Sequence, residues 1–103
     1  MKVRMPDKFG LPAQPKVEAE LLKLLAFSPQ PLSTNEIYRL LADTFRLVAS
    51  QRAVRREATR PDPAWNWLVR RALQRLEAEG WVYRPERGAW VVTKKGRASG
   101  REA

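Results

Sequence analysis

Hydrophobic residues recur at helical spacing in three stretches of the chain, residues 16–28, 33–46 and 62–79. In the third stretch, Trp65 and Val69 lie four positions apart, and further apolar residues continue the same period. Because residues three and four apart lie on one face of a helix, each stretch predicts an amphipathic helix with one buried face. The expected core consists of Val17, Leu21, Leu25, Ile37, Leu41, Trp65, Val69, Leu73, Leu76 and Trp90.

Short sequence signals mark the ends of the second and third helices. Ser33 precedes Glu36 by three residues, which predicts a capping box in which each side chain bonds the other residue's backbone N–H. Asp62 is the expected N-cap of the third helix, with Pro63 at its first position, where a missing N–H has no cost. Gly80 is the expected left-handed residue that ends this helix.

After the third helix, the hydrophobic pattern changes from the helical period to alternation. Residues 81–84 and 89–93 alternate like strands, and the Pro-Glu-Arg-Gly segment between them predicts a turn with Gly88 at positive φ. Leu32 is expected to add a short third strand to this hairpin. The elements together predict an α+β fold that is mainly α, a winged helix-turn-helix with three helices and a two-stranded β wing.

One domain accounts for most of the chain. Residues 1–15 contain several prolines and a glycine, which predicts an N-terminal arm, either held to the body by Phe9 and Leu11 or frayed. Residues 16–96 form the predicted winged-helix domain. Residues 97–103 are basic and rich in small residues, so they predict a disordered tail.

Residues 46–60 separate the second and third helices by more than the few residues of a compact helix-turn-helix. The segment is rich in arginine, and its apolar residues keep enough periodicity for a short extra helix. Two interpretations stay open, a second surface that contacts phosphates and a solvated connector with no binding role.

Charge and composition narrow the function classes. The chain has 103 residues and a net charge of +9, which favours a polyanionic partner, first nucleic acid and second an anionic membrane surface. Cysteine and histidine are absent, which excludes disulfides, thiolate chemistry and imidazole bases or ligands. No apolar run reaches the roughly 18 residues of a membrane span. We therefore expect a cytoplasmic DNA-binding protein rather than an enzyme, with no cofactor and no metal site.

The face of the third helix opposite its apolar stripe carries side chains suited to the DNA major groove. Arginine forms a bidentate pair with guanine, and asparagine or glutamine does the same with adenine. The wing adds further cations, and the N-terminus of the second helix offers N–H groups to a phosphate. The alternative is that the arginines only keep the helix solvated, and that the second helix is simply well capped. The candidate DNA-binding residues are Ser33, Thr34, Asn66, Trp67, Arg70, Arg71, Gln74, Arg75, Arg84, Arg87, Lys94 and Lys95.

Trp67 lies nearly opposite the core stripe on the same helix, so it is expected to be exposed. An exposed tryptophan often marks an interface. Here it could contact a thymine methyl group or 5-methylcytosine, or stack on a base. The alternatives are packing against the N-terminal arm or the arginine-rich segment, and a dimer contact.

Several motifs resemble one known family. The first helix contains L-L-K-L-L-A, and the second begins with P-L-S-T-N-E-I. Trp65 is followed by V-R-R-A-L-Q-R-L-E-A-E-G and then by R-P-E-R-G-A-W-V-V-T-K-K-G-R. From Leu21 to Gly96 the chain resembles the N-terminal winged-helix domain of Mrr-type restriction endonucleases. The long charged segment before Trp65 is also similar to that family, whereas Leu68 and Arg71 depart from its usual pattern.

The resemblance implies a domain that recognises DNA on behalf of a separate C-terminal nuclease domain. The chain has no Asp-x-Lys or Glu-x-Lys pair of the kind that holds Mg²⁺ in such a nuclease, so cleavage is not implied. We therefore expect sequence- or modification-sensitive binding to double-stranded DNA. A homodimer, or a nuclease or effector domain in a longer chain, stays open as a further partner, and no membrane partner is expected. The alternative function is a protein–protein interaction module or a small transcriptional regulator.

Overall fold

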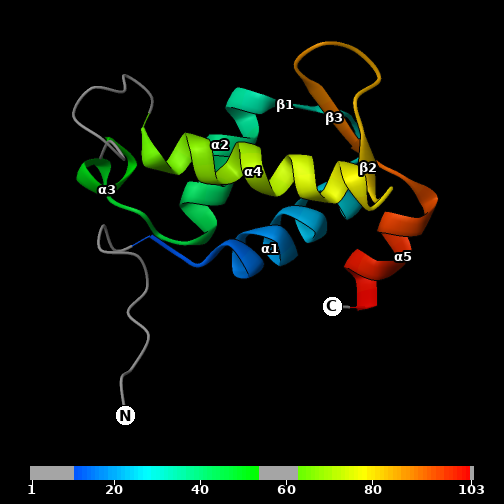
Figure 1. The fold of residues 1–103 in the computed structure, drawn as a ribbon, viewed down its shortest axis with the longest axis horizontal. Coiled ribbons are helices and arrows are strands. Elements are labelled where there is room, and N and C mark those ends of the chain that lie inside the picture. The colour runs from blue at the N-terminus through cyan, green and yellow to red at the C-terminus, as the bar shows by residue number, and fades with distance from the viewer. Residues whose placement is uncertain (1–10, 54–62, 103) are drawn as a thin grey trace.

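Five helices and three short strands make up the part of the chain that the computed structural model describes, residues 11–53 and 63–102 (Figure 1). The helices are α1 (Gln14–Ala26), α2 (Thr34–Thr44), α3 (Ala49–Ala53), α4 (Ala64–Ala78) and α5 (Lys94–Glu102). The strands are β1 (Leu32–Ser33), β2 (Val82–Tyr83) and β3 (Ala89–Val92). α4 crosses the middle of the molecule, and the β2–β3 hairpin follows its C-terminal end. The predicted α+β fold, mainly α, is confirmed, and two helices, α3 and α5, and the strand β1 add to the three predicted helices and the two-stranded hairpin.

One apolar core connects α1, α2 and α4 with the hairpin. All the predicted core residues are buried, and Leu11, which precedes α1, is fully covered as well. Trp65 is 1% exposed, and its indole N–H donates to the carbonyl of Tyr38 at 3.0 Å, so burial leaves that group satisfied. Phe45 meets the Trp65 ring edge-on, with the ring centroids 6.0 Å apart.

The C-terminal end of α4 directs the chain into the hairpin. Gly80 has a φ of +77°, as predicted. Its N–H donates to the carbonyl of Glu77, and the N–H of Trp81 donates to the carbonyl of Leu76, each at 3.0 Å. This pair of bonds is a Schellman motif, which satisfies carbonyls that the last turn of a helix leaves unpaired.

Helices α4 and α1 each start at a position that differs from the prediction, and a proline lies at each start. The predicted N-cap of α4 is wrong by one position, because Pro63 itself is the N-cap and its carbonyl accepts from the Trp67 N–H at 3.2 Å. Asp62 lies outside the described residues. α1 begins at Gln14, earlier than predicted, because Pro15 fits the first turn of a helix, where its missing N–H needs no partner.

α2 keeps its predicted capping box and ends in a left-handed residue. The Ser33 hydroxyl accepts from the Glu36 N–H at 3.1 Å, and the Glu36 carboxylate accepts from the Ser33 N–H at 3.0 Å. The helix stops at Thr44, short of the predicted end, and Arg46 has a φ of 55°. The Arg46 N–H donates to the carbonyl of Asp43, so this helix also ends in a left-handed cap, here without a glycine.

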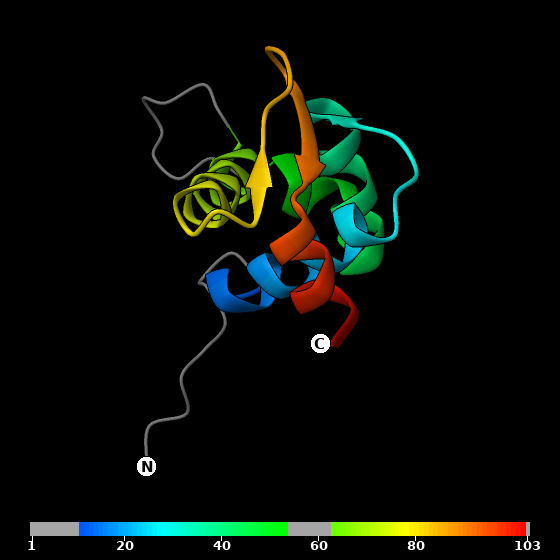
Figure 2. The same cartoon turned by 90° about the vertical axis from the view of Figure 1, so that its right-hand side faces the viewer.

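The strands form an antiparallel sheet in the order β1–β3–β2 (Figure 2). Leu32 pairs with Trp90, so the predicted third strand is confirmed. Gly88 has a φ of +78°, as expected for the turn. Its carbonyl accepts from the Thr34 N–H at 3.0 Å, which ties the tip of the wing (residues 81–93) to the start of α2.

Residues 94–102 form helix α5, so the prediction of a disordered tail from residue 97 is wrong for the described residues. The Thr93 hydroxyl accepts from the Gly96 N–H at 3.1 Å at the start of this helix. The Arg97 guanidinium donates to the carbonyl of Ala26 at 2.7 Å, which fixes α5 beside the end of α1 (Figure 2). The tail has little apolar pattern of its own, and its order comes from such contacts with distant residues.

The arginine-rich segment begins with a short helix, α3, as its periodicity suggested. Residues 54–62 lie outside the described residues, as do Phe9 and its predicted contact. Among the helices of the described ranges, none is long and apolar enough to cross a membrane.

Candidate nucleic-acid interface

The polar side of α4 carries two separate groups of candidate residues. Arg70 and Gln74 lie toward the wing, whereas Arg75 lies toward α1. Residues three or four positions apart share one face of a helix, so Arg70, Gln74 and Glu77 form a single row. The predicted DNA-binding residues of α4 therefore do not form one surface.

A cavity of about 210 Å³ lies between α4, the wing and the start of α2, and we name it the helix–wing cavity. Its lining combines candidate residues from three separate segments with an aromatic wall and one carboxylate. The lining residues are Thr34, Arg70, Leu73, Gln74, Glu77, Arg84 and Trp90. The fold thus brings polar side chains of α4 and of the wing to one place.

Trp90 contacts two polar side chains of the helix–wing cavity, those of Thr34 and Arg84. Its side chain is 6% exposed, and its indole N–H donates to the Thr34 hydroxyl at 3.1 Å. The Arg84 guanidinium lies over the same ring, 5.2 Å from the ring centroid. Arg84 Nε also donates to the Glu77 carboxylate at 3.3 Å. These contacts connect α2, α4, β3 and the residue that follows β2.

The N-terminus of α2 has already used donors that a phosphate would need. The Ser33 N–H bonds the Glu36 carboxylate, the Thr34 N–H bonds the Gly88 carbonyl, and the Glu36 N–H bonds the Ser33 hydroxyl. Ser33 therefore acts as a helix cap in the structure, and Thr34 is the residue of this pair that lines the cavity. The bond from the Ser33 N–H, and then its hydroxyl, hold the pKa of Glu36 below its usual range.

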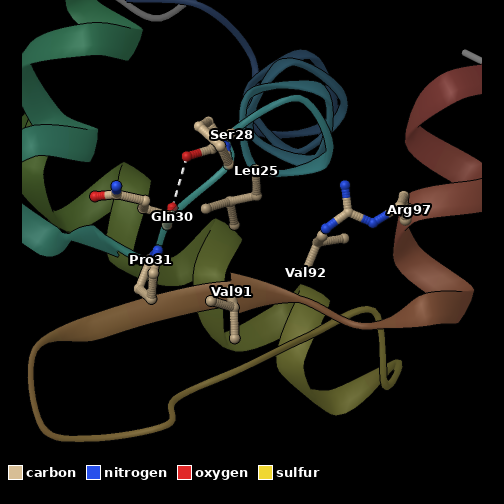
Figure 3. A pocket seen from close by; sticks show the side chains of 8 residues that line it. Leu25, Ser28, Gln30, Pro31, Val91, Val92 and Arg97 are labelled. Carbon is tan, nitrogen blue, oxygen red and sulfur yellow. Dashed lines mark hydrogen bonds between the residues drawn. The ribbon is translucent and has the colours of Figure 1, made fainter.

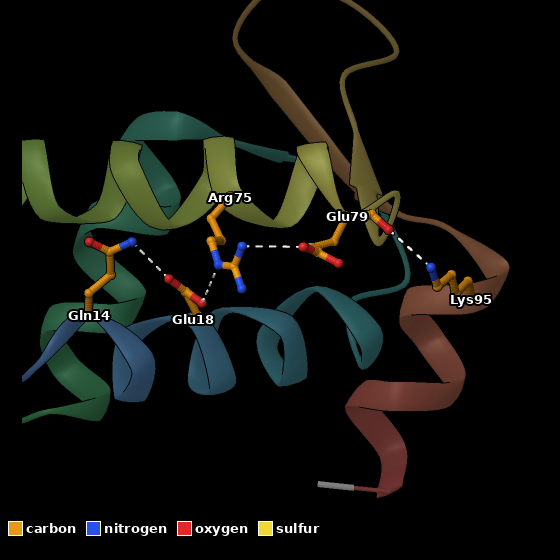
Figure 4. A network of polar contacts seen from close by, with 5 residues as sticks. All are labelled: Gln14, Glu18, Arg75, Glu79 and Lys95. Carbon is orange, nitrogen blue, oxygen red and sulfur yellow. Dashed lines mark hydrogen bonds and ion pairs between the residues drawn. The ribbon is translucent and has the colours of Figure 1, made fainter.

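Arg75 and Lys95 belong to a different network, between α1, α4 and α5 (Figure 4). Arg75 Nε lies 3.7 Å from the Glu18 carboxylate, and Arg75 Nη1 donates to the Glu79 carboxylate at 3.2 Å. Lys95 Nζ donates to the backbone carbonyl of Glu79 at 3.1 Å, at the negative end of the α4 dipole. Both cations therefore bond groups of other turns and helices, and neither lines the helix–wing cavity.

Trp67 is half-buried and not exposed as predicted. It packs against the apolar core, and the exposed Arg71 guanidinium covers its ring at 5.1 Å from the centroid. The buried arc of α4 is wider than the predicted stripe, because Ala64 and Leu68 are 3% and 8% exposed. Trp67 borders that arc, which explains its partial burial.

The other candidates lie at the ends of α4 and beyond it. Asn66 lines an open cavity together with Arg52 of α3. Since Asn66 precedes Arg70 by four positions, the polar row of α4 extends from α3 to the wing. Arg87 is exposed in the wing turn, and Lys94 is exposed at the start of α5.

Three residues that line the helix–wing cavity were not among the predicted site residues, namely Leu73, Glu77 and Trp90. Leu73 and Trp90 were predicted to lie in the core, and Glu77 was not a candidate residue. The spacing of Glu77 from Gln74 was an available signal, since the two lie on one helix face. The partner of Glu77, Arg84, lies in the wing, and the sequence of α4 gives no information about where the wing lies.

A smaller cavity of about 60 Å³ lies between the end of α1, the segment before β1, β3 and α5 (Figure 3). The Ser28 hydroxyl donates to the Gln30 carbonyl at 2.6 Å there, and Arg97 is bonded to Ala26. The space holds only a few water molecules, so we assign it no binding role. Over the described ranges, no cluster of three or more acidic, cysteine or histidine residues could hold a metal ion.

A family model described as the Mrr N-terminal domain matches residues 16–102. The matched range includes every described helix and strand from β1 to α5 and almost all of α1. A search of the curated proteins and a search of the solved structures found no match.

Proposed function

Because the chain belongs to the Mrr N-terminal domain family, we propose that it binds double-stranded DNA through the surface around the helix–wing cavity. In this proposal α4 enters the major groove together with Arg84, the wing residue that lines the same cavity, and the turn of the wing lies against the neighbouring backbone or minor groove. The major groove is about 12 Å wide and admits one α-helix.

The main support for the proposal is that Arg70, Gln74 and Arg84 line the same cavity. An arginine can pair with guanine O6 and N7, and a glutamine can pair with adenine N6 and N7. Thr34 adds a hydroxyl from α2 to the same lining. Side chains of α4 and of the wing thus offer hydrogen-bond donors and acceptors over one continuous area, as base recognition requires.

Charge supports the same partner. The net charge of +9 attracts a polyanion, and release of counterions from DNA favours binding. Arg87 and Lys94 are exposed beside the wing and are suited to phosphate contacts. We propose that these residues contribute affinity and that the lining of the cavity contributes selectivity.

The proposed function is binding without cleavage. By its resemblance to Mrr-type restriction proteins, the domain would direct a nuclease or effector domain to DNA. The purified chain, mixed with duplex DNA and Mg²⁺ or Mn²⁺, should leave the DNA intact. Cleavage that disappears when a carboxylate of this chain is replaced would disprove this part of the proposal.

Arg70 and Arg75 provide a matched test, because they lie on the same helix and carry the same charge. Arg70→Ala should weaken binding to a preferred sequence by about 1–3 kcal/mol and reduce the preference over random DNA. Arg75→Ala should keep that preference, because Arg75 is paired with Glu18 and Glu79. Fluorescence anisotropy with preferred and random duplexes at several salt concentrations measures both effects. Equal effects of the two substitutions on the preference would refute the proposed surface.

A protein–protein interaction module is the second candidate, and an exposed wing tyrosine favours it. Tyr83 is 49% exposed, and half-buried Trp67 lies elsewhere on the surface. Aromatic residues are enriched in protein interfaces. A protein partner would give binding with shallow salt dependence, whereas DNA gives a steep one.

A further inference from the structure

Glu77 is an acidic residue among the neutral and cationic side chains that line the helix–wing cavity. A carboxylate repels nearby phosphates, so its presence lowers the affinity of this surface for DNA of any sequence. Its Oε2 atom lies 3.3 Å from Arg84 Nε, and its side chain is 35% exposed. The position of Glu77 therefore points to a role that acts through Arg84.

Arg84 is held on two sides of its guanidinium group. Glu77 accepts the bond from Nε, and the ring of Trp90 lies 5.2 Å from the guanidinium carbon. Trp90 is itself fixed by its bond to Thr34. Within the described ranges, the terminal Nη nitrogens of Arg84 have no bonded protein partner. The two-pronged end of the side chain is thus available to a ligand, while its plane is fixed.

The Glu77–Arg84 pair is electrically neutral, and this property distinguishes two kinds of ligand contact. Phosphate binding depends mainly on net positive charge, whereas a guanine edge requires two donors in a fixed direction. The pair has no net positive charge to attract a phosphate, but the two contacts of Arg84 still fix the direction of its terminal N–H donors. We infer that Glu77 is a positioning residue that directs Arg84 toward a guanine edge, and that it increases sequence selectivity at the expense of general affinity. This inference rests on the proposed DNA-binding function.

Glu77→Gln keeps the size of the side chain and removes its charge. Arg84 then becomes an unpaired cation, so the affinity for random duplex DNA should rise and the salt dependence should steepen by about one unit. Selectivity for the preferred sequence should fall by about 5- to 150-fold, the range for loss of one bidentate base contact. Arg84→Lys should lose the same selectivity while its charge is retained, because an ammonium group lacks the planar fork.

Glu79→Gln is the matched control. Glu79 lies on the same helix two positions later, and its carboxylate pairs with Arg75 outside the helix–wing cavity. The substitution removes the same charge, but from a pair outside the proposed DNA-binding surface, so both the selectivity and the salt dependence should stay close to those of the unchanged protein. Thermal denaturation of every variant shows whether the fold is retained.

The test uses duplexes that the unchanged protein selects from a randomised library. Each guanine is then replaced in turn by 7-deazaguanine, which lacks the N7 acceptor. At one guanine, replacement by 7-deazaguanine should lower the affinity of the unchanged protein and of Glu79→Gln. The same replacement should not change the affinity of Glu77→Gln or Arg84→Lys, provided that both variants fold. If all four proteins respond alike at every guanine, or if no sequence is selected, the inference is wrong. If Arg70→Ala reduces selectivity and Glu77→Gln does not, the inference fails and the proposed function stands; if the unchanged protein binds no duplex, both fail.

Discussion

Gly96 lies at a position where the fold has no room for a side chain. A Cβ atom there would overlap the backbone carbonyl of Trp81 and lie 2.8 Å from Val92 Cγ2. Because backbone atoms cannot rotate away, Gly96→Ala is expected to lower the free energy of unfolding by about 1–3 kcal/mol. Ser99→Ala on the same helix should have an effect near zero. Denaturant unfolding measures both, and an unchanged stability of Gly96→Ala would contradict this close contact.

Glu36 gives one hydrogen-bonded pair a dependence on pH. Its pKa in the folded chain is lowered, chiefly by the bond from the Ser33 N–H, below the usual value of about 4.3. A carboxylate with a lowered folded pKa contributes stability above its unfolded pKa, and this contribution is lost as the pH falls through the folded pKa.

Glu36→Gln should therefore remove part of the acid sensitivity of the fold. The stability difference between the unchanged protein and this variant should be largest near neutral pH and should shrink below about pH 4.3. Denaturant unfolding at a series of pH values measures the difference, and Glu20→Gln, on α1, is the control. A difference that is independent of pH would show that ionisation of Glu36 does not contribute.

At the scale of elements, α5 joins the ends of two other helices. Arg97 donates to the carbonyl of Ala26 at the end of α1, and Lys95 donates to the carbonyl of Glu79 at the end of α4. Each cation of α5 lies at the negative end of another helix's dipole, and each satisfies a carbonyl near the C-terminus of that other helix. Although α5 lies outside the helices expected from the sequence, it holds α1 and α4 together from one side.

Removal of one of these contacts should measure its contribution. Arg97→Ala is expected to lower the free energy of unfolding by about 1–3 kcal/mol, because a bond to a charged donor is lost and a carbonyl is left without its partner. Lys94→Ala, at an exposed position of the same helix, should change it little. Thermal and denaturant unfolding provide the comparison. Equal stability of the two variants would mean that the Arg97 contact has no net effect in solution.

The sequence predicted elements whose signals are local and missed one whose stability comes from distant residues. The capping box at Ser33 and the positive φ of Gly80 depend on neighbours within a few positions, and both are confirmed. The order of α5 depends on Arg97 reaching Ala26, 71 positions away, and on the close approach of Gly96 to Trp81. A hydrophobic pattern carries no information about such contacts, and composition alone predicted disorder.

At the scale of the whole molecule, the same limit applies to the candidate site. A helical wheel gives the direction of each side chain of α4, and it correctly placed Trp65, Val69 and Leu73 in the core, although it placed Trp67 on the exposed side. It does not show that α1 borders one side of α4 while the wing borders the other. For that reason Arg70 and Arg75 were equivalent candidates, although the structure pairs Arg75 with Glu18 and places Arg70 in the helix–wing cavity. The partner of Glu77 is Arg84 of the wing, so this pair could not be predicted from the sequence of α4 alone.

The bond from the Thr34 N–H to the Gly88 carbonyl has a consequence for the kinetics and heat of binding. It ties the wing to α2 at the turn, while the β2–β3 pairing holds the other end of the hairpin. A wing that is ordered before it meets DNA loses little conformational entropy when it docks. Association should then be limited by diffusion and charge attraction, without a slower step in which the hairpin folds. The heat-capacity change of binding should likewise match the apolar area buried at the interface, with no added contribution from folding of the wing.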